Sequence, residues 1–205
     1  MTKINFRFSW VYNDLVKDSW LRIHKQPSAY PSDKKIKTAL QTRLRAWKKV
    51  EKRVIQAIEK NTSVQFMDAI TTCYVVGRSI PFSDPLTLPI FFKYPISRFV
   101  DSLTHELIHR IFSQPDGERL FRKIMKRLCQ RYPKENWNTI LHVVIHAVHA
   151  IVYRTIFMEK RLKQDMDFVS DLPDYKRAWE IVLNETPEKI LSKRTVDRYE
   201  RIKQS

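Results

Sequence analysis

The segment Val100–Phe112, VDSLTHELIHRIF, has the most regular pattern in this chain of 205 residues. Apolar residues recur at intervals of four, beginning with Phe99 just before the segment and continuing at Leu103, Leu107 and Ile111. This period predicts an amphipathic helix with one buried face. In such a helix His105 and His109 lie one turn apart and project from the same side.

The two histidines and the residue that follows the first of them favour a metal site. Two imidazoles one helical turn apart can bind one Zn²⁺, and Glu106 can then reach a zinc-bound water as general base. The alternative is a partly buried helix whose histidines are satisfied by ordinary hydrogen bonds. We prefer the metal site because five of the six histidines of the chain fall in two clusters.

The second cluster lies in Leu141–His149, LHVVIHAVH. Helical periodicity places His142, His146 and His149 along one stripe of a helix that follows Asn138. A catalytic zinc ion usually takes three protein ligands and keeps a fourth position for water. We therefore expect His146 or His142 to be the third ligand. We favour His146, and the spacing leaves both open, while His149 is expected to be supporting or buried.

The sequence Thr104–His109, THELIH, resembles the active-site helix of the zincin metallopeptidases. The layout is similar to that of gluzincins, in which a downstream helix supplies the third ligand, although gluzincins use glutamate where this chain has histidine. The metzincin continuation H-x-x-G-x-x-H is missing, because Arg110–Asp116 contains neither glycine nor histidine. The resemblance covers roughly residues 86–153 and implies zinc-dependent hydrolysis of peptide bonds in a peptide or protein substrate.

Strand patterns precede this helix. Alternation over Ile4–Trp10 and a β-branched run over Val64–Gly77 each predict a strand. In Leu86–Ile90 apolar residues alternate around Pro89, which cannot donate a ladder hydrogen bond and therefore demands an edge position. Zincins run an edge strand along the cleft before the active-site helix, so the resemblance implies that this segment pairs with an extended substrate.

Glycine is rare in the chain, with Gly77 and Gly117 the only two, which leaves little room for glycine-dependent hairpins or phosphate loops. The expected fold is α+β: one mostly helical domain over residues 1–205, with a small sheet whose edge strand precedes the H-E-x-x-H helix. The longest expected helices run from Ser32, as N-cap, to about Lys60 and from Asn138 as far as Lys163. A terminal helix is expected over Pro187–Lys203, with Thr186 as its N-cap.

The net charge is +16, which could attract nucleic acid, an anionic membrane or an acidic protein. Lys and Arg are spread over the expected helices without a long basic run, so solubility is the simpler explanation of the charge. Cys73 and Cys129 are too few for a disulfide framework. Without a signal-peptide pattern or an apolar run of membrane-spanning length, we expect a cytoplasmic protein with no membrane span.

Two functions from different classes fit these observations. The first is a zinc metallopeptidase of the zincin type. The second is a basic protein associated with nucleic acid, in which the zinc is structural or the peptidase acts on DNA-bound proteins. A closed site of four ligands would favour a structural zinc, whereas three ligands and a water would argue against it. The sequence leaves the oligomeric state open.

Overall fold

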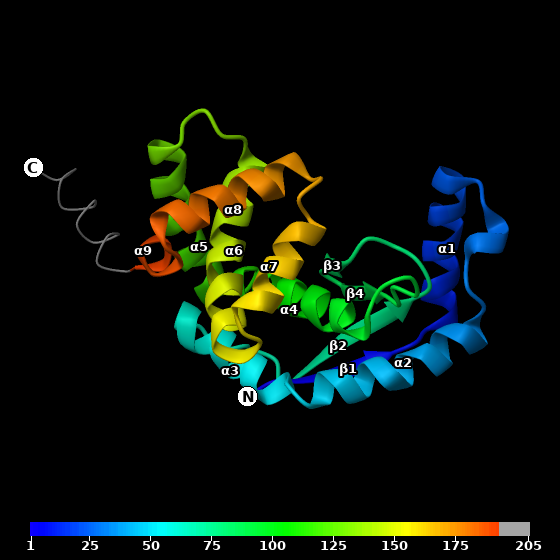
Figure 1. Ribbon diagram of the computed structural model, residues 1–205. Helices are drawn as coiled ribbons and strands as arrows, with labels where there is room; N and C mark the ends of the chain where they lie inside the picture. The colour runs from blue at the N-terminus through cyan, green and yellow to red at the C-terminus, as the bar shows by residue number, and fades with distance from the viewer. Residues whose placement is uncertain (193–205) are drawn as a thin grey trace, which may run out of the picture. The chain divides into compact units, whose positions relative to one another are not determined.

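The computed structural model describes residues 1–192, which form a small sheet and several helices (Figure 1). In chain order the elements are β1 (Lys3–Arg7), α1 (Trp10–His24), a short 3₁₀ helix (Pro27–Ala29), α2 (Asp33–Lys48), α3 (Glu51–Thr62), β2 (Ile70–Val76), β3 (Phe82–Ser83), β4 (Leu86–Pro89), α4 (Ile96–Phe112), α5 (Pro115–Arg131), α6 (Trp137–Ile156), α7 (Glu159–Phe168), α8 (Pro173–Glu185) and α9 (Pro187–Leu191). The predicted α+β class, mostly helical with a small sheet, is confirmed.

The chain divides into two compact units. The first combines residues 1–55 with residues 66–110 and contains the sheet, α1, α2 and most of α4. The second combines residues 56–65 with the chain from Ile111 onward and is helical over its described part. The division of the chain as one domain over residues 1–205 stays a prediction.

The sheet of the first unit has the strand order β1-β2-β4-β3. β1, β2 and β4 run parallel, with Phe6 opposite Cys73 and Val75 opposite Leu88, and β3 runs antiparallel to β4. All four residues of β4 are buried, as expected for an apolar strand with neighbours on both sides. Helices α1 and α2 contact β2 and help to cover the sheet.

The prediction that Leu86–Ile90 forms an edge strand is wrong. β4 lies between β2 and β3, and the edge is β3, which pairs Phe82 with Thr87 and Ser83 with Leu86. The proline is tolerated because β3 reaches only the first two residues of β4, while Pro89 closes the strand opposite Val76. The ladder to β2 continues past it through the amide of Ile90, which donates to the Val76 carbonyl at 3.1 Å.

The single helix expected from Ser32 to about Lys60 is two helices. Ser32 is the N-cap of α2 as predicted, since its hydroxyl accepts from the Lys35 amide at 3.4 Å. The chain turns at Lys49 and Val50, and the Val50 amide donates to the Trp47 carbonyl. Trp47 on one side and Val54 on the other are both fully buried, and no glycine or proline announces the turn.

Helix α6 is the centre of the second unit and contacts α5, α7, α8 and α9 (Figure 1). The side chain of its N-cap, Asn136, accepts from the Thr139 amide at 2.8 Å. The helix ends at Ile156 rather than Lys163, and α7 starts after Met158, whose φ is 74°. The terminal helix starts at Pro187 as predicted, but the Thr186 side chain makes no capping bond. The part of that prediction beyond Ser192 lies outside the described residues.

Candidate metal centre

Helix α4 confirms the helix predicted from the H-E-x-x-H segment. Its apolar stripe is fully buried, at Phe99, Leu103, Leu107, Ile108 and Ile111. Arg110, near its C-terminal end, forms ion pairs with Asp68 at 3.3 Å and Asp84 at 3.5 Å, and both acids lie in loops next to strands of the first unit. The Phe99 ring also lies 5.9 Å from that of Phe6 in β1, and these contacts hold the helix against the sheet of the first unit.

His105 and His109 face each other on this helix. Their Nε2 atoms lie 3.1 Å apart and their ring centroids 4.8 Å apart. Two Zn–N bonds of about 2.0–2.1 Å at a tetrahedral angle place their nitrogens about 3.3 Å apart. The two rings are therefore close to the spacing that one zinc ion requires. Both side chains are partly exposed, which leaves an approach for an ion.

Glu106, next to His105, has a different environment. Its residue is only 8% exposed, and burial raises the pKa of its carboxyl from 4.5 to about 7. The side chain lies near the fully buried Cys73 of β2, whose thiol pKa is raised by burial and, to a smaller extent, by the charge of Glu106. A carboxyl group with a pKa near neutrality can take up and release a proton at physiological pH.

His142 of α6 is buried and held by its own helix. Its Nδ1 lies 2.8 Å from the Asn138 carbonyl oxygen. Because a carbonyl oxygen only accepts, Nδ1 carries the proton and Nε2 keeps its lone pair. Burial lowers the pKa of His142, more than the Asn138 bond and the charge of Asp174 raise it, so the ring favours the neutral form. A neutral imidazole with one nitrogen bound to a carbonyl is the usual state of a metal ligand.

His146 and His149 pack against neighbouring side chains of the second unit. The ring of His146 stacks on Trp179 of α8, with centroids 4.1 Å apart and an interplanar angle of 10°. His149 Nδ1 lies 3.8 Å from a carboxylate oxygen of Asp165 on α7, and its ring meets Tyr153 edge-on at 4.3 Å. These contacts agree with the supporting or buried role expected for His149.

His105, His109 and His142 form a group that could hold a metal ion. Each offers one ring nitrogen as a possible ligand. The donor set suits zinc as well as other ions that imidazole binds, so the group itself does not select the metal. The group contains His142 and not His146, although the choice of third ligand stays a prediction.

Two aromatic residues of α8 contact the histidines of α6, and the sequence did not assign them to the site. The Tyr175 ring lies 3.9 Å from that of His142, and Trp179 stacks on His146. A signal was present, because Tyr175 and Trp179 are four residues apart, as His142 and His146 are. Matching intervals on two helices indicate facing stripes only once the helices are known to be neighbours.

By length and composition alone, α6 could cross a membrane. Of the apolar window that meets this criterion, 72% is buried inside the protein. The core helix of a globular protein passes the same test, so the observation is weak evidence for a membrane span.

Comparisons with known proteins do not extend this description. No family model, no curated protein and no solved structure matches the chain. The resemblance to zincins therefore depends on the H-E-x-x-H helix and on the group of three histidines.

Proposed function

We propose that this protein is a zinc-dependent peptidase in which Glu106 is the general base. One observation carries the proposal: the His105 and His109 Nε2 atoms lie 3.1 Å apart on a helix whose intervening residue Glu106 is a buried carboxyl with a pKa raised to about 7. The two histidines and the general base thus lie on two successive turns of the same helix.

The residues present fit a zinc ion. His105 and His109 would hold it through Nε2, and His142 or His146 would complete a set of three, the number typical of a catalytic site. When bound, zinc supplies Lewis-acid polarisation of the scissile carbonyl and increases the acidity of water. A structural zinc would need a fourth protein ligand, whereas the group found in the described residues has three members.

Glu106 supplies the proton transfer of the proposed reaction. In its ionised form the carboxylate accepts a proton from the attacking water, and in its protonated form it delivers that proton to the leaving amine. A pKa near 7 keeps both forms accessible without a large energetic cost. Burial also keeps bulk water from competing for the carboxylate.

The substitution Glu106→Gln tests the proposal. It preserves the size of the side chain and removes the proton acceptor, so hydrolysis should fall by about 10²–10⁴-fold while zinc stays bound. Zinc content is measured by elemental analysis, and cleavage by mass spectrometry of a diverse peptide mixture. The matched control is Glu118→Gln on α5, where the glutamate is exposed and paired with Arg122.

Three outcomes would contradict the proposal. A wild-type protein that neither contains nor takes up zinc removes the metal centre. A Glu106→Gln variant as active as the Glu118→Gln control removes Glu106 from the mechanism. A zinc environment of four protein ligands, measured by X-ray absorption, would instead favour the structural zinc of a nucleic-acid-associated protein.

A further inference from the structure

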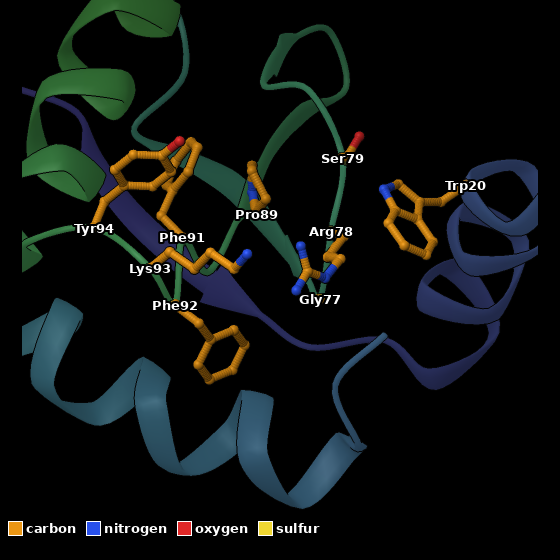
Figure 2. Close-up of a pocket in the computed structure, with 9 residues that line it drawn as sticks. All are labelled: Trp20, Gly77, Arg78, Ser79, Pro89, Phe91, Phe92, Lys93 and Tyr94. Carbon is orange, nitrogen blue, oxygen red and sulfur yellow. The ribbon is translucent and has the colours of Figure 1, made fainter. Parts of the chain in front are cut away.

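The first unit contains a pocket of about 340 Å³ at the carboxyl ends of two parallel strands. Gly77 and Arg78 follow β2 directly, and residues 91–94 follow β4. Figure 2 shows the lining residues, which are Trp20, Gly77, Arg78, Ser79, Pro89, Phe91, Phe92, Lys93 and Tyr94. Ligands of sheets with parallel strands commonly bind at this end of the strands, and the volume is within the usual range for a small-molecule pocket.

Two cations enter this pocket without a counter-charge. The ends of Arg78 and Lys93 both project into the space between Tyr94 and Trp20 (Figure 2). No acidic residue is among the lining residues, and no ion pair of the described residues includes Arg78 or Lys93. Two cations in one hollow without a carboxylate between them repel each other, and an anion between them would relieve that repulsion.

Arg78 is held in place by the surrounding structure. Its Nε donates to the Ala29 carbonyl at 2.5 Å, and its guanidinium lies over the Trp20 ring at 5.4 Å. The preceding residue must be glycine, because a Cβ at Gly77 would come within 2.7 Å of Pro31 and Tyr30. The Gly77 amide donates to Asn13 and Tyr30, which join the end of β2 to α1. The guanidinium is therefore preorganised rather than mobile on the surface.

Aromatic rings form the other part of the pocket wall. The turn after β4, closed by the Tyr94 amide donating to the Phe91 carbonyl, brings their two rings to a centroid distance of 6.3 Å. Tyr94 is 46% exposed and Phe92 41%, so both rings reach the surface, and the Arg43 guanidinium lies over the Phe92 ring at 6.0 Å. A planar base can stack on such faces while its phosphate lies between the cations.

A second hollow adjoins the pocket through Phe92, which lines both. It lies on the first turns of α2, and its other lining residues are Ser32, Lys34, Lys35, Thr38 and Ala39. Basic residues therefore continue beyond the pocket, separated from it by an exposed aromatic ring. This arrangement suits consecutive nucleotides of a strand better than one free nucleotide.

We infer that this pocket binds a nucleotide of a single-stranded nucleic acid, with its phosphate between Arg78 and Lys93 and a base stacked on an aromatic ring of the wall. The net charge of +16 would attract such a strand at long range. An acidic peptide could use the two cations, but it would leave the exposed rings without a planar partner. The inference is independent of the metal centre.

Fluorescence anisotropy tests this inference with the full chain and a fluorescein-labelled oligothymidylate of about twelve nucleotides. Lys93→Gln should weaken binding about tenfold and lower the salt dependence by roughly one phosphate contact. Tyr94→Leu should weaken binding about tenfold at unchanged salt dependence, because stacking carries no charge. The matched controls Lys49→Gln and Arg45→Gln remove exposed cations outside both hollows and should change affinity less than twofold.

Each contradicting result is specific. Equal losses in Lys93→Gln and Lys49→Gln would mean diffuse attraction to a basic surface, and no binding of the oligonucleotide would remove the inference. Competition by thymidine monophosphate as strong as by the strand would assign the pocket to free nucleotides. Equally strong competition by oligoglutamate would make it a general anion site. Arg78→Gln serves as a second pocket variant if circular dichroism shows that this variant folds. If Arg78→Gln does not fold, Lys93→Gln still decides the test, because it changes only an exposed side chain.

Discussion

Helices α4 and α6 each carry two histidines four residues apart, yet the two pairs lie in different environments. On α4 the rings of His105 and His109 face each other at 4.8 Å, and both are partly exposed. On α6 the rings of His142 and His146 are 5.6 Å apart, and both are buried against aromatic rings of α8. The same spacing in the sequence thus gives one pair whose ring nitrogens face each other and another pair whose rings pack on aromatic side chains.

The two rings of α6 also differ from each other in how their atoms are used. His146 uses its ring face on Trp179, so its contribution is mainly contact area. His142 instead fixes one ring nitrogen on the Asn138 carbonyl, which leaves the other nitrogen as a lone-pair donor. We therefore predict that the anchored ring, His142, is the metal ligand of this pair.

The largest expected effect is on zinc affinity at α4. His105→Ala and His109→Ala each remove one of two nitrogens at ligand spacing, so affinity should fall by several orders of magnitude. Titration of metal-free protein against a chelating indicator measures the loss. His24→Ala, which changes an exposed histidine of α1, should bind zinc as the wild type does. If both α4 variants bind zinc as tightly as the wild type, the α4 pair is not a metal site and does not differ from the α6 pair in function.

The next effect separates the two rings of α6. His142→Ala should weaken zinc binding by at least about 100-fold, whereas His146→Ala should weaken it about tenfold or less, as the loss of a neighbour of the ligands does. The same titration decides. If His146→Ala has the larger effect, the sequence-based preference for His146 is correct and the anchored nitrogen of His142 is not the mark of a ligand.

Glu106 should make the metal-free protein less stable as the pH rises. Below pH 4.5 the carboxyl is protonated in both states; above that the unfolded chain releases the proton while the folded protein holds it until about pH 7. Stability conferred by the protonated form is therefore lost between these values, by about 3 kcal/mol in total. Urea unfolding in the presence of a chelator measures the free energy of unfolding of both proteins. The stability of Glu106→Gln relative to the wild type should increase between pH 4.5 and 7 and stay constant above pH 7. A constant difference at every pH would contradict the buried carboxyl.

The smallest expected effect is on stability at the histidines themselves. His146→Ala removes a fully packed ring and should lower the free energy of unfolding of the metal-free protein by about 2–3 kcal/mol. His109→Ala, at a partly exposed position, should lower it by less than about 1 kcal/mol. Urea unfolding measures both changes. Equal losses of stability would mean that the histidines of α4 and α6 contribute equally to packing.

Local patterns gave correct predictions where packing agreed with them. The period of four over Phe99–Ile111 predicted α4, and Ser32 predicted the start of α2. They failed where distant residues decided. Pro89 predicted an edge strand, but β3 spans only Phe82–Ser83 between two prolines and is too short to show alternation. The turn at Lys49 likewise has no breaking residue, and the burial of Trp47 and Val54 accompanies it instead.

For the site, the amino-acid order alone establishes that His105 and His109 share one face of a helix, because residues four apart are neighbours in any α-helix. It also establishes that Glu106 follows His105 directly. It also places three histidines on one stripe of α6. Tertiary structure decides which other helices each ring contacts: Tyr175 lies against His142, Trp179 covers His146, and Asp165 lies beside His149. These assignments depend on how α6 is rotated against α7 and α8, which is determined by the packing of whole helix surfaces and not by any local signal.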